Sequence, residues 1–141
     1  MTTGGNSYMR IIVPGKPIAQ ARPRFYRKGN YVGTYNPQAT EAGLWLSKAY
    51  EQVTDRFEGP LSLHMTFIMP IPKAWSKKQR AQLIEKTAYH NKKPDIDNLI
   101  KFVLDCLNGM AWKDDSQIAV IYALKFYGEN PKTEIIIKGI P

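Results

Sequence analysis

The chain has 141 residues, 43% of them hydrophobic, and a formal net charge of +8 at pH 7. This composition excludes a disordered chain, and the length predicts a single domain over residues 1–141 that buries a core without disulfide bonds. Cys106 is the sole cysteine, and no apolar run approaches the roughly 20 residues of a membrane span, so we expect a cytoplasmic protein without membrane contact.

The first half of the chain is predicted to form two strands separated by a helix. A strand is expected over residues 8–13, followed by a polar loop rich in Gly, Arg and Tyr that runs to about Pro37. Apolar periodicity then predicts a helix over residues 40–54 and a half-buried strand over residues 61–69. The side of the helix that we expect to be buried carries Leu44, Trp45, Ala49 and Val53.

The second half is predicted to form two helices and then two strands. Ser76 is a suitable cap for a helix that runs to about Thr87, and a third helix is expected over residues 96–107. Residues 117–127 and 133–138 have the composition of strands, with a hairpin loop between them. This order predicts an α+β domain, with about three helices packed on a small mixed β-sheet.

Basic side chains gather in two stretches of the sequence. The first acid is Glu41, so the arginines and lysines before it have no local compensation, and residues 73–93 carry a single Glu85 among many lysines. Such clusters favour nucleic-acid binding, although a solvated face that maintains solubility is the alternative. Tyr26, Tyr31 and Tyr35 interleave with the first stretch, where they either stack on unpaired bases or pack locally. The candidates for phosphate contacts are Arg22, Arg24, Arg27, Lys28, Lys92 and Lys93.

Acidic side chains are concentrated at two points of this basic chain. Asp95 and Asp97 flank one residue at the start of the third predicted helix, and Asp114 and Asp115 immediately precede a predicted strand. Carboxylates this close together repel one another unless a cation lies between them. Oxygen-only ligand sets suit Mg²⁺ or Mn²⁺, and a basic surface around such a metal is what cleavage of a phosphate backbone requires. The pattern therefore favours a nuclease.

Each of these residues also has an ordinary structural interpretation. Asp97 alone is a good helix N-cap, although one cap does not need both Asp95 and Asp97. Aspartates are also common in turns such as the one expected at residues 114–115. Lys101 follows Asp97 by one helical turn, so it either stabilises a transition state or pairs with its acidic neighbours.

The acidic motifs closely resemble those of the RusA family of Holliday junction resolvases. The resemblance rests on Lys93-Pro94-Asp95-Ile96-Asp97-Asn98-Leu99-Ile100-Lys101, Asp105-Cys106-Leu107-Asn108-Gly109 and Trp112-Lys113-Asp114-Asp115-Ser116-Gln117-Ile118. Residues 15–24 and 35–37 are similar to the basic arm of the Gram-positive and phage branch of that family. The resemblance implies a homodimeric, magnesium-dependent endonuclease that resolves four-way DNA junctions in recombination and repair and is often encoded by prophages.

The resemblance also implies roles for individual residues. Asp95, Asp97 and Asp115 match the catalytic, metal-binding aspartates, and Lys101 matches the catalytic lysine. Asp114 matches a neighbouring acid that is a further candidate for the metal, so the third ligand is either Asp115 or Asp114. Two rival classes stay open on the residues alone. A non-catalytic DNA-binding module accounts for the charge but not for the carboxylates, whereas a structural metal-binding protein accounts for the carboxylates but not for the basic arm.

Overall fold

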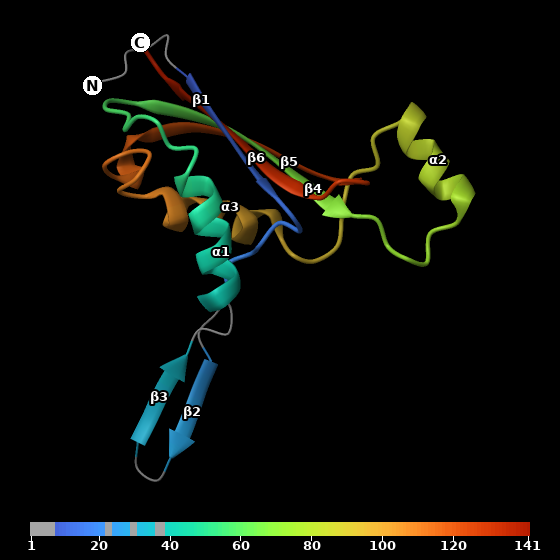
Figure 1. Cartoon of the computed structure of the whole chain (residues 1–141), viewed down its shortest axis with the longest axis horizontal. Helices are drawn as coiled ribbons and strands as arrows, with labels where there is room; N and C mark the ends of the chain where they lie inside the picture. Colours follow the sequence, from blue (N-terminus) through green and yellow to red (C-terminus); the bar gives the residue numbers. More distant parts are fainter. Residues whose placement is uncertain (1–7, 22–23, 29–30, 36–38) are drawn as a thin grey trace.

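Four strands form one mixed sheet in the order β1-β6-β4-β5 (Figure 1). The computed structural model describes residues 8–21, 24–28, 31–35 and 39–141. The β1–β6 and β6–β4 pairs are antiparallel, whereas β4 and β5 run parallel. The strands are β1 (Tyr8–Pro14), β4 (Leu61–Pro70), β5 (Ile118–Gly128) and β6 (Lys132–Gly139).

The alternating sequence of β4 determines which face of the sheet is covered. Leu63, Met65 and Phe67 are at most 1% exposed, and the residues between them are half-buried. Because successive side chains of a strand point to opposite faces, one face of β4 is wholly apolar. The half-buried strand predicted from this alternation is confirmed.

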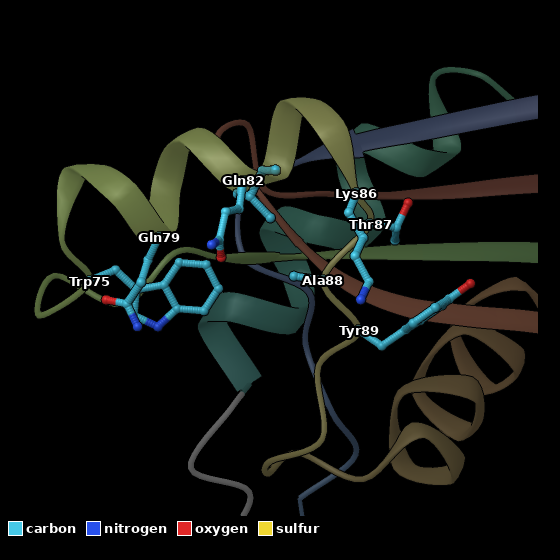
Figure 2. Close-up of a pocket in the computed structure, with 8 residues that line it drawn as sticks. Trp75, Gln79, Gln82, Lys86, Thr87, Ala88 and Tyr89 are labelled. Carbon is cyan, nitrogen blue, oxygen red and sulfur yellow. The ribbon is translucent and has the colours of Figure 1, made fainter.

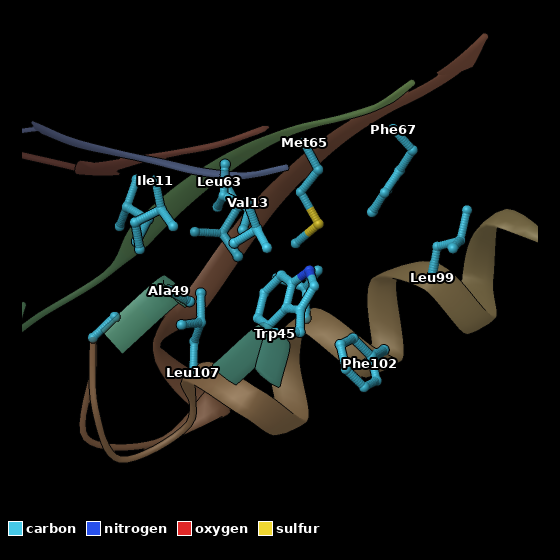
Figure 3. Packing of buried hydrophobic residues seen from close by; sticks show 14 of the residues in the cluster. Ile11, Val13, Trp45, Ala49, Leu63, Met65, Phe67, Leu99, Phe102 and Leu107 are labelled. Carbon is cyan, nitrogen blue, oxygen red and sulfur yellow. The ribbon is translucent and has the colours of Figure 1, made fainter. Parts of the chain in front are cut away.

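Two helices cover the apolar face of the sheet (Figures 1 and 3). They are α1 (Ala39–Tyr50) and α3 (Ile96–Leu107). Trp45 of α1 meets Phe102 of α3 edge to face, with ring centroids 5.2 Å apart. Both rings belong to the same buried cluster as Ile11 and Met65 of the sheet. The remaining helix, α2 (Lys77–Glu85), buries none of its residues and lies apart from this core.

These elements confirm a single α+β domain with a small mixed sheet and three helices. Among the described residues, no helix is long and apolar enough to cross a lipid bilayer.

Three sequence expectations were wrong. The polar loop contains an antiparallel hairpin of β2 (Arg24–Lys28) and β3 (Tyr31–Tyr35), which extends away from the sheet (Figure 1). The last two strands do not form a hairpin, because β4 lies between β5 and β6. The helix predicted to reach residue 54 ends at Tyr50, and its Leu44 is 64% exposed rather than buried.

Candidate active site

Asp95 and Asp97 lie at the exposed N-terminal end of α3. Asp95 is the N-cap, and its side chain makes no capping hydrogen bond, so its carboxylate is not committed to the helix. Asp97 lies in the first turn, where a negative charge is favourable next to the helix dipole. The opposite face of α3 is anchored in the core by Leu99, Phe102, Val103 and Leu107. This packing holds both carboxylates on rigid backbone, as a metal site requires.

A lysine from the neighbouring strand fixes the loop in front of these carboxylates. Lys125 of β5 donates through Nζ to the backbone oxygens of Lys92, at 2.8 Å, and Pro94, at 2.7 Å. An open cavity of about 400 Å³ lies at this point, lined by Lys93, Pro94, Asp95 and Asn98. The loop therefore presents positive charge beside the carboxylates, with Lys92 and Lys93 exposed.

The basic arm starts beside the same helix end. The amide of Gln20 donates to the backbone oxygen of Asn98 at 2.9 Å, which places the root of the arm next to Asp95 and Asp97. Strand β2 follows and contains Arg24, Arg27 and Lys28. Arg22 lies outside the described residues.

Asp115 begins a short 3₁₀ turn (Asp115–Gln117) that leads into β5, and Asp114 is the N-cap of this turn. Asp114 accepts a 3.0 Å hydrogen bond from the amide of Ser116, and hydrogen bonds from the side chain and backbone of Ser116 lower the pKa of Asp114. Asp115 instead accepts a 2.8 Å hydrogen bond from the indole Nε1 of Trp112 through one carboxylate oxygen. Asp114 thus caps the turn through one carboxylate oxygen, and Asp115 is oriented through one of its own.

The two carboxylate pairs lie at opposite ends of α3. The chain leaves α3 at Leu107 and turns back through Met110 and Ala111, whose amides both donate to the Leu107 oxygen. The 12 residues of α3 span about 18 Å. Among the described residues, no group of three or more His, Cys, Asp or Glu side chains is arranged to hold a metal ion. Each end of α3 therefore offers half of the predicted ligand set.

Lys101 lies between the two pairs, on the exposed side of α3. It follows Asp97 by one helical turn, and Asp105 follows it by another, so the three exposed side chains form one polar stripe along α3. A lysine four residues from each aspartate is within side-chain reach of either one. Its catalytic role stays a prediction.

Three positioning residues were not predicted from the sequence. Trp112 is fully buried and orients Asp115 through its indole N–H. The side-chain oxygen of Gln117 stabilises the acidic turn by accepting hydrogen bonds from the amides of Lys113 and Asp114. The third is Lys125, which holds the loop before Asp95. Two signals were available: a buried indole needs a hydrogen-bond acceptor, and a lysine within an apolar strand needs partners.

The structure also contains a cavity of about 430 Å³ between α2 and the segment that follows it (Figure 2). Trp75 and Tyr89 lie at its two sides, and Gln79, Gln82 and Lys86 project from the helix side. No Asp or Glu lines this cavity, so it lacks the oxygen ligands expected of a hydrolytic metal site.

The thiol of Cys106 is expected to be unreactive in the folded protein. Burial, and secondarily the charge of Asp105, raises the pKa of Cys106 to about 11, so little thiolate exists at pH 8. We expect iodoacetamide to label Cys106 at least about tenfold more slowly in the folded protein than in urea, as followed by mass spectrometry. Equal labelling rates in the two states would contradict the burial of this thiol.

The fold and these residues define a small α+β protein that displays carboxylates on a basic surface, as enzymes acting on phosphate esters do. The chain belongs to the RusA family: the sequence model of the family described as "Endodeoxyribonuclease RusA" matches residues 14–138 of this chain. The chain is also similar to "Uncharacterized protein YqaN" of Bacillus subtilis (strain 168). The two are 32% identical over 141 residues, which cover 94% of this chain and 96% of the relative. The resemblance inferred from the motifs is confirmed.

Proposed function

We propose that this protein is a magnesium-dependent endodeoxyribonuclease that resolves four-way DNA junctions during recombination and repair. The observation that carries the proposal is the family match, which runs from residue 14 to residue 138 and includes both carboxylate pairs. The exposed basic loop beside Asp95 supports it, because a nuclease must attract the phosphate backbone before cutting it.

The donor set fits a hard divalent cation. Asp95 and Asp97 offer exposed carboxylate oxygens at one helix end, and Asp115 offers an oriented carboxylate with one oxygen engaged by Trp112. Oxygen ligands of this kind suit Mg²⁺ or Mn²⁺. When bound, the metal supplies Lewis acidity and lowers the pKa of a coordinated water.

The remaining work falls to the basic side chains. Lys92 and Lys93 bind and position the phosphate backbone at the entrance of the site. Hydrolysis forms a bond between a water oxygen and phosphorus and breaks the phosphorus–oxygen bond to one sugar, and the proton that the water loses is balanced by the proton that the departing sugar oxygen gains. Lys101 stabilises the extra negative charge of the transition state from its position one turn beyond Asp97. Asp114, the exposed acid next to Asp115, is the alternative third ligand for the metal.

The proposed working unit is a symmetric homodimer. Resolution of a junction requires paired cuts in two symmetry-related strands, and cyclic dimers are the commonest symmetric assemblies. Within one copy, the two carboxylate pairs lie at opposite ends of α3, so a single chain does not bring the proposed ligands together. A dimer in which Asp95 and Asp97 of one copy meet the partner's Asp115 supplies three ligands at each of two equivalent sites.

Cleavage of a synthetic four-way junction tests the proposed function. With Mg²⁺ the protein should make paired symmetric cuts, while a linear duplex of the same sequence stays intact and EDTA stops the reaction. Binding without cutting in either Mg²⁺ or Mn²⁺ would support the DNA-binding module instead. Cleavage that continues in EDTA would contradict the role of the metal.

Arg24→Ala should weaken junction binding through the loss of one phosphate contact. Loss of one contact lowers the slope of log affinity against log salt concentration by about 1. A fluorescence titration of a labelled junction at several salt concentrations measures this slope. Lys138→Ala removes the same charge from an exposed position in β6 and serves as the control. Equal slopes for the two variants would show that Arg24 does not contact the backbone.

A further inference from the structure

The cavity of about 430 Å³ beside α2 is lined by none of the proposed metal ligands (Figure 2). Its volume lies within the roughly 300–1,000 Å³ of ordinary ligand pockets. The rings of Trp75 and Tyr89 lie at its two sides, and Gln79, Gln82 and Lys86 project into it from the helix side. The lining therefore combines flat apolar surfaces with two amide groups and a cation.

Local contacts, rather than the core, hold the helix side of the cavity in place. Helix α2 has nine residues and buries none of them, and an isolated helix shorter than about 12–15 residues is marginal in water. Ser76 and Gln79 form a capping box at its start, with hydrogen bonds of 3.1 and 2.8 Å. Arg80 donates to the backbone oxygen of Pro72 at 3.2 Å and so ties the helix to the loop before it. A helix that is ordered in this way without adding to the core is expected to act at the surface.

Both rings of the cavity are positioned by the end of the sheet. The Trp75 ring is half-buried against Tyr127 of β5, with ring centroids 4.8 Å apart. Tyr89 belongs to a segment that pairs with β5 through backbone hydrogen bonds of 2.9 and 3.0 Å, and its side chain is 66% exposed. Two aromatic surfaces on fixed backbone are thus open to a flat ligand.

The charge around the cavity favours a negatively charged ligand. Residues 73–93 contain seven lysines and arginines and a single acid, Glu85. Within the described ranges, the one ion pair joins Arg10 to Glu134, in β1 and β6, so none of these seven cations is paired with a carboxylate. Cations interleaved with open aromatic rings are typical of surfaces that bind single-stranded nucleic acid, where bases stack on the rings and cations contact phosphates. An acidic peptide matches the charge but makes no comparable use of two open rings.

We propose that this cavity binds an unpaired base of single-stranded DNA, stacked on Trp75 or Tyr89, with Lys86 at a neighbouring phosphate. The side-chain oxygen of Gln79 is engaged by the amide of Ser76, so its NH₂ group is left to donate to an acceptor on the base. The inference rests on the proposed function in that a DNA junction supplies the unpaired base at its branch point.

The position of the cavity suits a strand that continues to the carboxylates. Tyr89 precedes Asp95 by six residues, so their Cα atoms are at most about 22 Å apart. The exposed Lys92 and Lys93 lie in this interval, in the loop that Lys125 holds. A strand with one base in the cavity is therefore led past these two lysines toward the proposed metal ligands.

The fluorescence of Trp75 reports on the cavity directly. The chain has three tryptophans, and Trp45 and Trp112 are only 4% and 0% exposed. In EDTA, which withholds the metal, we expect a single-stranded thymidine octamer to quench the emission in a saturable manner. An oligoglutamate of the same net charge should leave the emission nearly unchanged. Absence of quenching by the octamer, or equal quenching by the peptide, would overturn the proposal.

Two tyrosine variants test the stacking role with matched chemistry. Tyr89→Ala should weaken binding of the octamer by about 5- to 140-fold, the effect of one lost stacking contact. Tyr50→Ala removes a ring that is 64% exposed at the end of α1 and should bind like the wild-type protein. Equal affinities for the two variants, with native circular dichroism, would refute a base in the cavity.

The salt dependence separates stacking from phosphate contact. Tyr89→Ala should keep the wild-type slope of log affinity against log salt concentration, because it removes no charge. Lys86→Ala should lower this slope by about 0.7, the value for one phosphate contact on a single strand. An unchanged slope for Lys86→Ala would refute the phosphate contact that the proposal assigns to this lysine.

Junction cleavage by the wild-type protein distinguishes this inference from the proposed function. A protein that cuts junctions in Mg²⁺, but whose Trp75 emission does not respond to the octamer, refutes the base site while the function stands. A protein that binds the octamer through Tyr89 but cuts no junction in Mg²⁺ or Mn²⁺ confirms the base site and refutes the function.

Discussion

Asp97→Asn is expected to lower the rate of junction cleavage by about 100- to 1,000-fold, the loss typical when one charge-stabilising group is removed from an active site. The substitution keeps the size and the exposed helical position of the side chain but removes a ligand charge. Junction binding should survive, because the basic arm and the loop at Lys92 and Lys93 are unchanged. Single-turnover cleavage and a binding titration on the same junction measure the two effects separately.

Asp105→Asn is the matched control for this prediction. Asp105 lies on the same exposed side of α3, two turns beyond Asp97, and outside the proposed ligand set. We expect this variant to cut within about threefold of the wild-type rate, since a surface charge substitution rarely has a large effect. Equal rates for Asp97→Asn and the wild-type protein would exclude Asp97 as a ligand.

Trp112→Ala is expected to produce the largest loss of stability. The indole is fully buried between the end of α3 and the acidic turn, and replacement of a buried Trp by Ala costs about 3–5 kcal/mol of unfolding free energy. Urea denaturation followed by circular dichroism measures this cost. Trp75→Ala serves as the comparison, because that ring is only half-buried, and we expect a smaller loss there. Equal losses would contradict the central position of Trp112.

Trp112→Phe separates the packing role of this residue from its hydrogen bond. The variant keeps an apolar ring in the core but lacks the Nε1–H that orients Asp115. We expect cleavage to fall by about 10- to 100-fold, as for other groups that orient a metal ligand. The loss should shrink at saturating Mn²⁺ if the hydrogen bond acts through metal affinity. An unchanged rate would show that Asp115 needs no such support.

Local patterns were sufficient to predict the elements that carry the site. The third helix was predicted with the bounds that the structure has, because Pro94 precedes it, Asn108-Gly109 ends it and its apolar face is continuous, although its N-cap is Asp95 and not the predicted Asp97. The alternation in β4 likewise identified its buried residues. These signals operate within one or two turns of chain, where sequence determines structure most directly.

The errors have a common cause in non-local pairing. The β5–β6 hairpin was inferred because the two strands are close in sequence. In the structure β4 pairs with both strands and lies between them, and a long connection joins β4 to its parallel neighbour β5. The β2–β3 hairpin was missed because its residues are polar and aromatic and lack an apolar alternation. Similarly, no spacing rule shows that Asp95 and Asp115 lie at opposite ends of one helix.

Subunit complementation tests most directly whether two copies build each catalytic site. Asp97→Asn and Asp115→Asn should each be inactive alone. A heterodimer of the two variants has one site with both changes and one site with neither. After unfolding and refolding an equal mixture, we predict that nicking of a four-way junction returns, with about a quarter of the wild-type number of active sites if the chains pair at random. A mixture that contains heterodimers but stays inactive, while the wild-type protein cuts, would contradict the shared site.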